Sequence, residues 1–288
     1  MRLTTRQFLK TSGLFAAALL LAACGKKEPP PPAVAASAPA AAPAPAPAKV
    51  YAVGVDAAYA PFESQNEKGE IVGFTIDVVN AAAAKAGVQV KFVNTPWEGI
   101  FNALGQGDRD MIASSVTITD ERKQTMDFSN PYFDAVQLIA VKENSKLAKF
   151  ADLKKAKVGV QTGTTGDEAV TKLLGKTSTN IKRFESTPLA LKELEAGGVD
   201  AVVADNGVVI HYVANNPGGK FKMVSDKEFA PEQYGFAVKK GNAELLGKMN
   251  EGIAGIKADG SYNAIFKKYF GTEPAPMAAA APATAASK

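Results

Sequence analysis

The sequence predicts an α/β protein made of two doubly wound lobes that are joined by a two-strand hinge. Three observations lead to this fold class. Short apolar strand patterns alternate with helix patterns, which is typical of parallel sheets covered by helices. This alternation occurs twice, over residues 50–114 and again over 157–214. Two further apolar strand patterns, 135–142 and 234–240, flank the second repeat, so the chain is expected to leave and re-enter the first lobe through them.

The first repeat has three strand patterns and two helix patterns. They are a strand at 50–55, a helix at 76–87, a strand at 90–94, a helix at 97–107 and a strand at 110–114. The first helix is rich in alanine, the strongest helix former, and Gly87 suits the left-handed conformation that often ends a helix. This unit is predicted to form the start of the first lobe.

The second repeat has the same order of elements. It consists of a strand at 157–161, a helix at 167–174, a strand at 181–185, a helix at 188–197, a strand at 200–204 and a helix at 206–214. Two final helices, 243–258 and 261–270, are expected to pack back on the first lobe. We therefore predict lobe 1 to comprise residues 50–139 and 237–271, and lobe 2 to comprise 140–236.

The N-terminal residues have the pattern of a bacterial export signal. A basic segment is followed by an apolar run at 14–23, which is too short to span a bilayer, and by small residues. Residues 21–24, LAAC, resemble a lipobox, so 1–23 are predicted to be a lipoprotein signal peptide and Cys24 the lipid-modified N-terminus. An ordinary secretory peptide with an incidental cysteine is the alternative.

Both ends of the chain have low-complexity compositions. Residues 24–49 are predicted to be a lipidated, extended Pro/Ala tether, and 272–288 a disordered Ala/Pro tail. The formal charge of the whole chain is +4, and three of its basic residues lie in the predicted signal peptide. The remainder is nearly neutral and has no basic patch, which argues against binding to nucleic acid.

Polar side chains follow the predicted strands at their carboxyl ends, where α/β sheets bind ligands. These residues are Asp56 and Tyr59 after the first strand, Ser114, Ser115, Thr117 and Arg122 after the third, Gln161 and Thr165 in a Gly/Thr loop, and Asp205 after the last. The Arg122 guanidinium fits a carboxylate bidentately. Taken alone, Arg122 could instead be a solvated surface residue, Asp205 a helix cap and Trp97 a core residue.

Several ordered motifs make residues 50–271 resemble the family 3 extracellular solute-binding proteins, the amino-acid-binding components of bacterial ABC importers. The motifs are DAAYAPFE (56–63), GEIVGFTIDV (69–78), SSVTITDER (114–122), MDFSNPYF (126–133), VGVQTGTTG (158–166), VDAVVADN (199–206) and ADGSYNAIFKKYFG (258–271). The resemblance implies a type II periplasmic binding protein fold with the ligand in the cleft between the lobes.

The resemblance also implies a role for each cleft residue. Arg122 would hold the ligand carboxylate with help from Ser115, Thr117 and, from lobe 2, Thr165. Asp205 would receive the α-ammonium together with the Ser115 carbonyl and Thr117. Tyr59 and Trp97 would sandwich the ligand side chain, and Asp56 would meet its distal end.

Two departures from the family pattern bear on the ligand. Glutamine-specific members carry a lysine where this chain has Gln161 and a histidine where it has Ala204. We therefore expect a polar or basic L-amino acid, with Arg, Lys or His favoured and Gln next. The implied partner is an ABC permease in the inner membrane, and we expect a periplasmic monomer that contacts the membrane through its lipid only, without metal or cofactor.

Two other functions are alternatives to amino acid import. Some relatives on this fold are cyclic-amino-acid dehydratases, but catalysis needs a positioned acid or base. His211 is the only histidine and is expected on the face of an apolar helix rather than in the cleft. The third possibility, delivery of the ligand to a membrane signalling receptor, would use the same ligand site.

Overall fold

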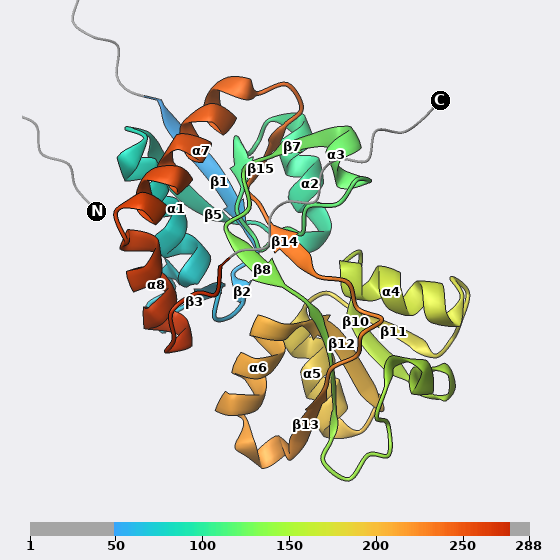
Figure 1. The fold of residues 1–288 in the computed structure, drawn as a ribbon. Helices are drawn as coiled ribbons and strands as arrows, with labels where there is room; N and C mark the ends of the chain where they lie inside the picture. The colour runs from blue at the N-terminus through green and yellow to red at the C-terminus, as the bar shows by residue number, and fades with distance from the viewer. Residues whose placement is uncertain (1–48, 277–288) are drawn as a thin grey trace, which may run out of the picture. The chain divides into compact units, whose positions relative to one another are not determined.

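The structure is a computed structural model that describes residues 49–276 (Figure 1). The predicted signal peptide, Cys24, the tether up to residue 48 and the tail from residue 277 lie outside the described residues. None of the helices in 49–276 has the length and apolar character that crossing a membrane requires.

Lobe 1 is built on a five-stranded sheet. Its strands, in spatial order, are β5 (Gln89–Asn94), β1 (Val50–Val55), β6 (Met111–Ile112), β15 (Ala237–Lys239) and β7 (Met126–Phe128). The first three are parallel, and β15 is antiparallel to both of its neighbours. The helices of this lobe are α1 (Phe74–Lys85), α2 (Trp97–Gln106), α3 (Arg122–Thr125), α7 (Ala243–Ala258) and α8 (Ser261–Phe270). As predicted, the two C-terminal helices pack on lobe 1, where both contact α1 (Figure 1).

Lobe 2 repeats this arrangement. Its strands, in spatial order, are β11 (Ile181–Phe184), β10 (Val158–Gln161), β12 (Ala201–Asp205), β9 (Gln137–Lys142) and β13 (Phe221–Val224). Again three parallel strands are followed by an antiparallel one. The helices are α4 (Thr165–Leu174), α5 (Thr187–Ala196) and α6 (Asn206–Asn215), with short 3-10 turns at Phe150–Lys155 and Pro217–Gly219.

The chain passes between the lobes through β8 (Phe133–Ala135) and β14 (Glu232–Tyr234), which form a two-stranded antiparallel sheet. Each of the two predicted hinge strands is split in the structure, because its two halves pair with different partners. Residues 137–142 join the lobe 2 sheet, and 237–239 join the lobe 1 sheet. The predicted α/β class with two lobes and a two-strand connection is confirmed.

The two crossing strands are anchored in the core of lobe 1. Phe133 of β8 and Tyr234 of β14 stack with ring centroids 5.4 Å apart. The buried ring of Phe62 meets both edge-on, at 4.8 and 5.5 Å. Such aromatic contacts add to the stabilisation from burial itself. The crossing strands therefore have a fixed position relative to lobe 1.

A small three-stranded sheet was not predicted from the sequence. It consists of β2 (Ala58–Tyr59), β3 (Glu63–Gln65) and β4 (Ile71–Val72). These strands are two or three residues long, too short for the alternation of polar and apolar residues to be recognised. The sheet holds Tyr59 and Glu63 next to the cleft.

Candidate functional site

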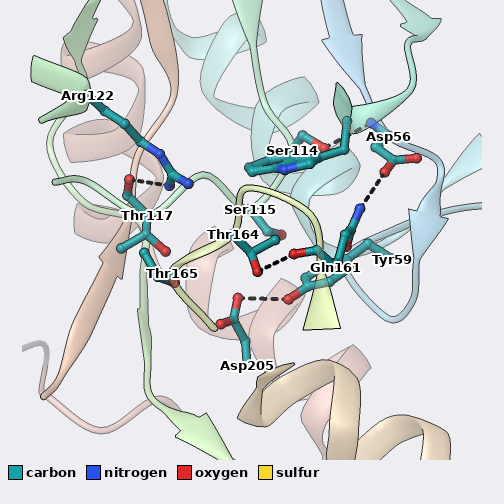
Figure 2. A pocket seen from close by; sticks show the side chains of 11 residues that line it. Asp56, Tyr59, Ser114, Ser115, Thr117, Arg122, Gln161, Thr164, Thr165 and Asp205 are labelled. Carbon is teal, nitrogen blue, oxygen red and sulfur yellow. Dashed lines mark hydrogen bonds between the residues drawn. The ribbon is translucent and has the colours of Figure 1, made fainter. Parts of the chain in front are cut away.

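The parallel strands of both lobes end at one pocket of about 340 Å³ (Figure 2). The residues lining the pocket are Asp56, Tyr59, Trp97, Ser114, Ser115, Thr117, Arg122, Gln161, Thr164, Thr165 and Asp205. All ten residues predicted from the sequence are among them. Their role in binding a ligand stays a prediction.

Arg122 is a buried residue rather than a solvated one. Arg122 is the first residue of α3. Its backbone N–H donates a hydrogen bond to the Thr119 hydroxyl at 3.2 Å. Within residues 49–276 no carboxylate forms an ion pair with Arg122. Burial lowers the pKa of its guanidinium, opposed by more distant acids such as Glu168. The surface ion-pair interpretation is therefore wrong.

The guanidinium of Arg122 is held in place from both lobes. Nη1 donates to the Thr117 carbonyl at 2.9 Å, and Nη2 donates to the Gly163 carbonyl of lobe 2 at 3.3 Å. The group also lies over the rings of Trp97 and Phe101, at 5.5 and 5.4 Å from their centroids. Since a guanidinium has five N–H groups, donors remain for an anion in the pocket.

The strand end at Ser114 and Ser115 has an unusual backbone. Ser115 has φ 49, in the left-handed region that non-glycine residues seldom adopt. Its hydroxyl donates to the buried carboxyl of Glu63 at 3.2 Å, and the Asp56 N–H donates to the Ser114 hydroxyl at 2.9 Å. Strained backbone of this kind occurs most often at functional sites.

Asp205 faces the pocket and is not a side-chain cap, although it precedes α6. Its Oδ2 accepts hydrogen bonds from the hydroxyls of Tyr59, at 2.7 Å, and Tyr234, at 2.5 Å, and Gln137 donates to Oδ1. Burial raises the pKa of Asp205, while these donors and the charge of Arg122 act in the opposite direction. Because Tyr59 belongs to lobe 1, its bond to Asp205 joins the two lobes.

Asp56 and Gln161 meet across the cleft. Gln161 Nε2 donates to Asp56 Oδ2 at 3.3 Å and to the Glu185 carbonyl at 3.0 Å. Burial raises the pKa of Asp56, and hydrogen bonds from Gln161 and the Trp97 backbone oppose the shift. In Figure 2, Asp56 and Arg122 lie on opposite sides of the pocket, so opposite charges face its two ends.

Trp97 is both a core residue and a pocket residue, so the two interpretations do not exclude each other. It is 8% exposed and packs with Ile100 and Leu104 of α2. His211, in contrast, is on α6 and lines another hollow, with no part in this pocket.

The pocket residue Thr164 was not predicted from the sequence, and neither were five residues around the pocket, Glu63, Phe101, Gln137, Glu232 and Tyr234. Gln137 could have been noticed because it is a polar residue within the apolar strand pattern at 135–142. Glu232 lies just outside the predicted strand at 234–240.

Among the described residues that line the pocket, Arg122 is the only base, whereas Asp56 and Asp205 are acids. Glu232 adds a third carboxylate behind Thr117 and Thr165. Burying carboxylates is costly unless opposite charge compensates them. The arrangement therefore suits a ligand with one carboxylate and an excess of positive charge.

Comparisons with known proteins agree with this geometry. Residues 51–272 match the model of bacterial extracellular solute-binding proteins, family 3. The chain is 44% identical over 263 residues, or 91% of its length and 95% of the relative, to a probable histidine-binding protein of Neisseria gonorrhoeae. It is 37% identical over 224 residues, 76% of its length and 86% of the relative, to the L-arginine-binding protein of Pseudomonas aeruginosa.

A solved structure shows the same fold. The arginine-, lysine-, histidine-binding protein ArtJ of Geobacillus stearothermophilus is 46% identical, with a TM-score of 0.76 over 78% of this chain and 97% of that one. With the family model covering most of the described residues and with the fold confirmed, the chain belongs to the bacterial extracellular solute-binding proteins, family 3.

Proposed function

We propose that this protein is the substrate-binding lipoprotein of an ABC-type amino acid importer, which closes over a basic L-amino acid and delivers it to the permease. The observation that carries this proposal is the charge of the pocket, which is lined by two carboxylates and one guanidinium and has a third carboxylate behind its wall. The names of the relatives, which are histidine- and arginine-binding proteins, support the same ligand class. Arg, Lys and His are the favoured ligands, and Gln is next.

The pocket geometry supports one orientation of the ligand. Its carboxylate would bind Arg122, its α-ammonium would bind Asp205, and its side chain would extend past Tyr59 and Trp97 towards Asp56. Each charge-assisted hydrogen bond contributes about 1.5–3 kcal/mol. A cationic side chain against Trp97 would add about 0.5–2 kcal/mol.

The location of the protein is part of the proposal. Lipidation at Cys24 would hold a monomer at the periplasmic face of a membrane, and residues 24–49 would be the tether to the folded part. In the folded part we place the lobe boundaries at the crossing strands β8 and β14, which shifts the predicted boundaries at 139/140 and 236/237 by a few residues.

We propose a binding protein rather than a dehydratase because the charged groups of the pocket, Arg122, Asp205 and Asp56, suit the charged ends of a basic amino acid. The relatives named above are binding proteins, which supports the same choice. Delivery to a signalling receptor would use the same closed form.

Titration calorimetry against a panel of L-amino acids tests the proposal. We expect Arg, Lys or His to bind most tightly. The bound amino acid should be recovered chemically unchanged after the experiment. Arg122→Ala should abolish binding of the whole panel. Asp56→Asn should weaken the cationic ligands about 10- to 150-fold, the equivalent of one charge-assisted bond, and leave Gln within a few-fold. Normal binding by Arg122→Ala would contradict the site, and consumption of the ligand would favour the dehydratase.

A further inference from the structure

Glu232 is a carboxylate that touches both lobes from the crossing strand β14. Its Oε2 accepts hydrogen bonds from the hydroxyl of Thr117 in lobe 1, at 2.8 Å, and from the hydroxyl of Thr165 in lobe 2, at 2.9 Å. Both threonines line the ligand pocket, and Glu232 lies behind them. One oxygen atom therefore connects the two walls of the pocket.

These hydrogen bonds determine what the Thr117 hydroxyl offers to a ligand. A hydroxyl has one proton to donate and two lone pairs. Because Thr117 gives its proton to Glu232, its oxygen faces the pocket as an acceptor. An acceptor suits an ammonium and repels a carboxylate. Thr165 gives its proton to the same atom, so towards a ligand carboxylate it has only its backbone N–H, one of the unpaired donors in the first turn of α4.

Glu232 also stands next to Asp205. The amide of Gln137 donates to both carboxylates, to Glu232 Oε1 at 3.1 Å and to Asp205 Oδ1. Burial and the charge of Asp205 raise the pKa of Glu232. Four hydroxyls and one amide donate to these two buried carboxylates, but no cation of residues 49–276 forms an ion pair with either of them. A cation that binds between Asp205 and Thr117 would supply the missing positive charge.

We propose that Glu232 is a positioning residue: it makes the Thr117 hydroxyl an acceptor for the α-ammonium of the ligand, and it joins Thr117 to Thr165 only when the lobes are closed. This inference rests on the proposed function, since it assumes an L-amino acid ligand. It identifies a feature that distinguishes an α-amino acid from the same carboxylic acid without the amino group.

The test uses L-arginine and its deamino analogue, 5-guanidinopentanoate, as probes. Calorimetry on the full-length protein gives the ratio of their two dissociation constants. In the wild type we expect a strong preference for L-arginine, because the analogue leaves buried acceptors unpaired. Glu232→Gln should lower this preference at least about tenfold, chiefly by weakening L-arginine. Glu232→Asp should restore part of it.

A second route does not alter the carboxylate. Thr117→Val removes the hydroxyl and should lower the same preference, and adding Glu232→Gln to Thr117→Val should lower it little further. The matched control is Glu228→Gln, an exposed glutamate in the segment before β14, which should behave as the wild type.

The outcomes separate the inference from the proposed function. A wild type that binds no member of the amino acid panel would overturn the proposed function, and the inference with it. A wild type that binds L-arginine, together with Glu232→Gln and Thr117→Val variants that weaken both probes equally, would overturn the positioning role alone. A lowered preference in either single variant, with the control unchanged, supports it.

Discussion

Glu63 is a buried acid directly behind the ligand pocket. Its side chain is fully buried, and Ser115 donates to Oε2, whereas Oε1 has no hydrogen-bond partner among the described residues. Burial holds the pKa of Glu63 well above its ordinary value of 4.5, against hydrogen bonds from Thr75 and Ser115 that lower it. The fold therefore favours the neutral carboxylic acid, which keeps the strained Ser115 in place without adding a charge.

A pH titration of stability should detect this acid. Above pH 4.5 the unfolded chain ionises Glu63 while the folded protein retains the proton, so the free energy of unfolding falls as the pH rises through the folded pKa. The Glu63→Gln variant has no ionisable group at this position. Between pH 4.5 and the folded pKa it should therefore lose less stability than the wild type, by up to about 1.4 kcal/mol per pH unit. Melting temperatures of both proteins without ligand, from about pH 5 to 8, give the comparison.

Glu67, which is exposed in the turn after β3, provides the control for Glu63. Glu67→Gln should follow the wild-type pH profile. Parallel profiles for wild type and Glu63→Gln would mean that Glu63 ionises equally in the folded and unfolded chains.

At the level of elements, the start of α6 packs closely against Phe62 of lobe 1. A Cβ atom on Gly207 would lie 2.4 Å from Cζ of Phe62. The Phe62 ring cannot move aside, since it is fully buried among Phe133, Tyr234 and other rings. Gly207 is therefore needed for the closed arrangement and has no such role when the lobes are apart.

Gly207→Ala should separate closure from stability. In a helix alanine is favoured over glycine by about 1 kcal/mol, so the ligand-free protein should be as stable as the wild type or more stable. Overpacking at the closed interface, about 1–3 kcal/mol, should weaken ligand binding about 5- to 150-fold. Calorimetry with the best ligand and chemical denaturation without ligand measure the two effects.

Gly247→Ala on α7 is the matched substitution, because nothing lies within 4 Å of the added atom. It should leave affinity unchanged. Wild-type affinity in Gly207→Ala would show that ligand binding does not need this contact between the lobes.

For the whole molecule, the ligand is expected to act as part of the interface between two separate cores. The sheets of the lobes have separate hydrophobic clusters, around Val53 and Phe74 in lobe 1 and around Val158 and Val203 in lobe 2. Pocket residues from both lobes face the same space. A ligand held by both walls should therefore couple the unfolding of the lobes.

Calorimetric melting should show this coupling. At about 100 times the dissociation constant, a ligand adds about 2.7 kcal/mol to the free energy of unfolding, which for a domain of this size raises the melting temperature by about 5–10 °C. We expect the whole transition to move. A separate transition that stays at its ligand-free temperature would show that one lobe does not contact the ligand.

Much of the site could be predicted because its residues have local signals. Asp56, Ser114, Gln161 and Asp205 each stand at or just past the end of an apolar strand pattern, and carboxyl ends of parallel strands meet at one edge of a sheet. The alternation of strands and helices likewise predicted both lobes. The shortest strands and the division of each crossing segment were missed, because they depend on pairing partners distant in the sequence.

By itself, the sequence determined the α/β class, the two lobes, the family and the ten residues around the pocket, since strand ends and motifs are properties of neighbouring residues. Only the tertiary structure decided which side chains are hydrogen-bonded to one another around the pocket. Tyr59 meets Asp205, 146 positions later, and Thr117 meets Glu232, 115 positions later. No periodicity specifies such pairs. They exist because the crossing strands bring the two lobes together around one small, buried and negatively charged pocket.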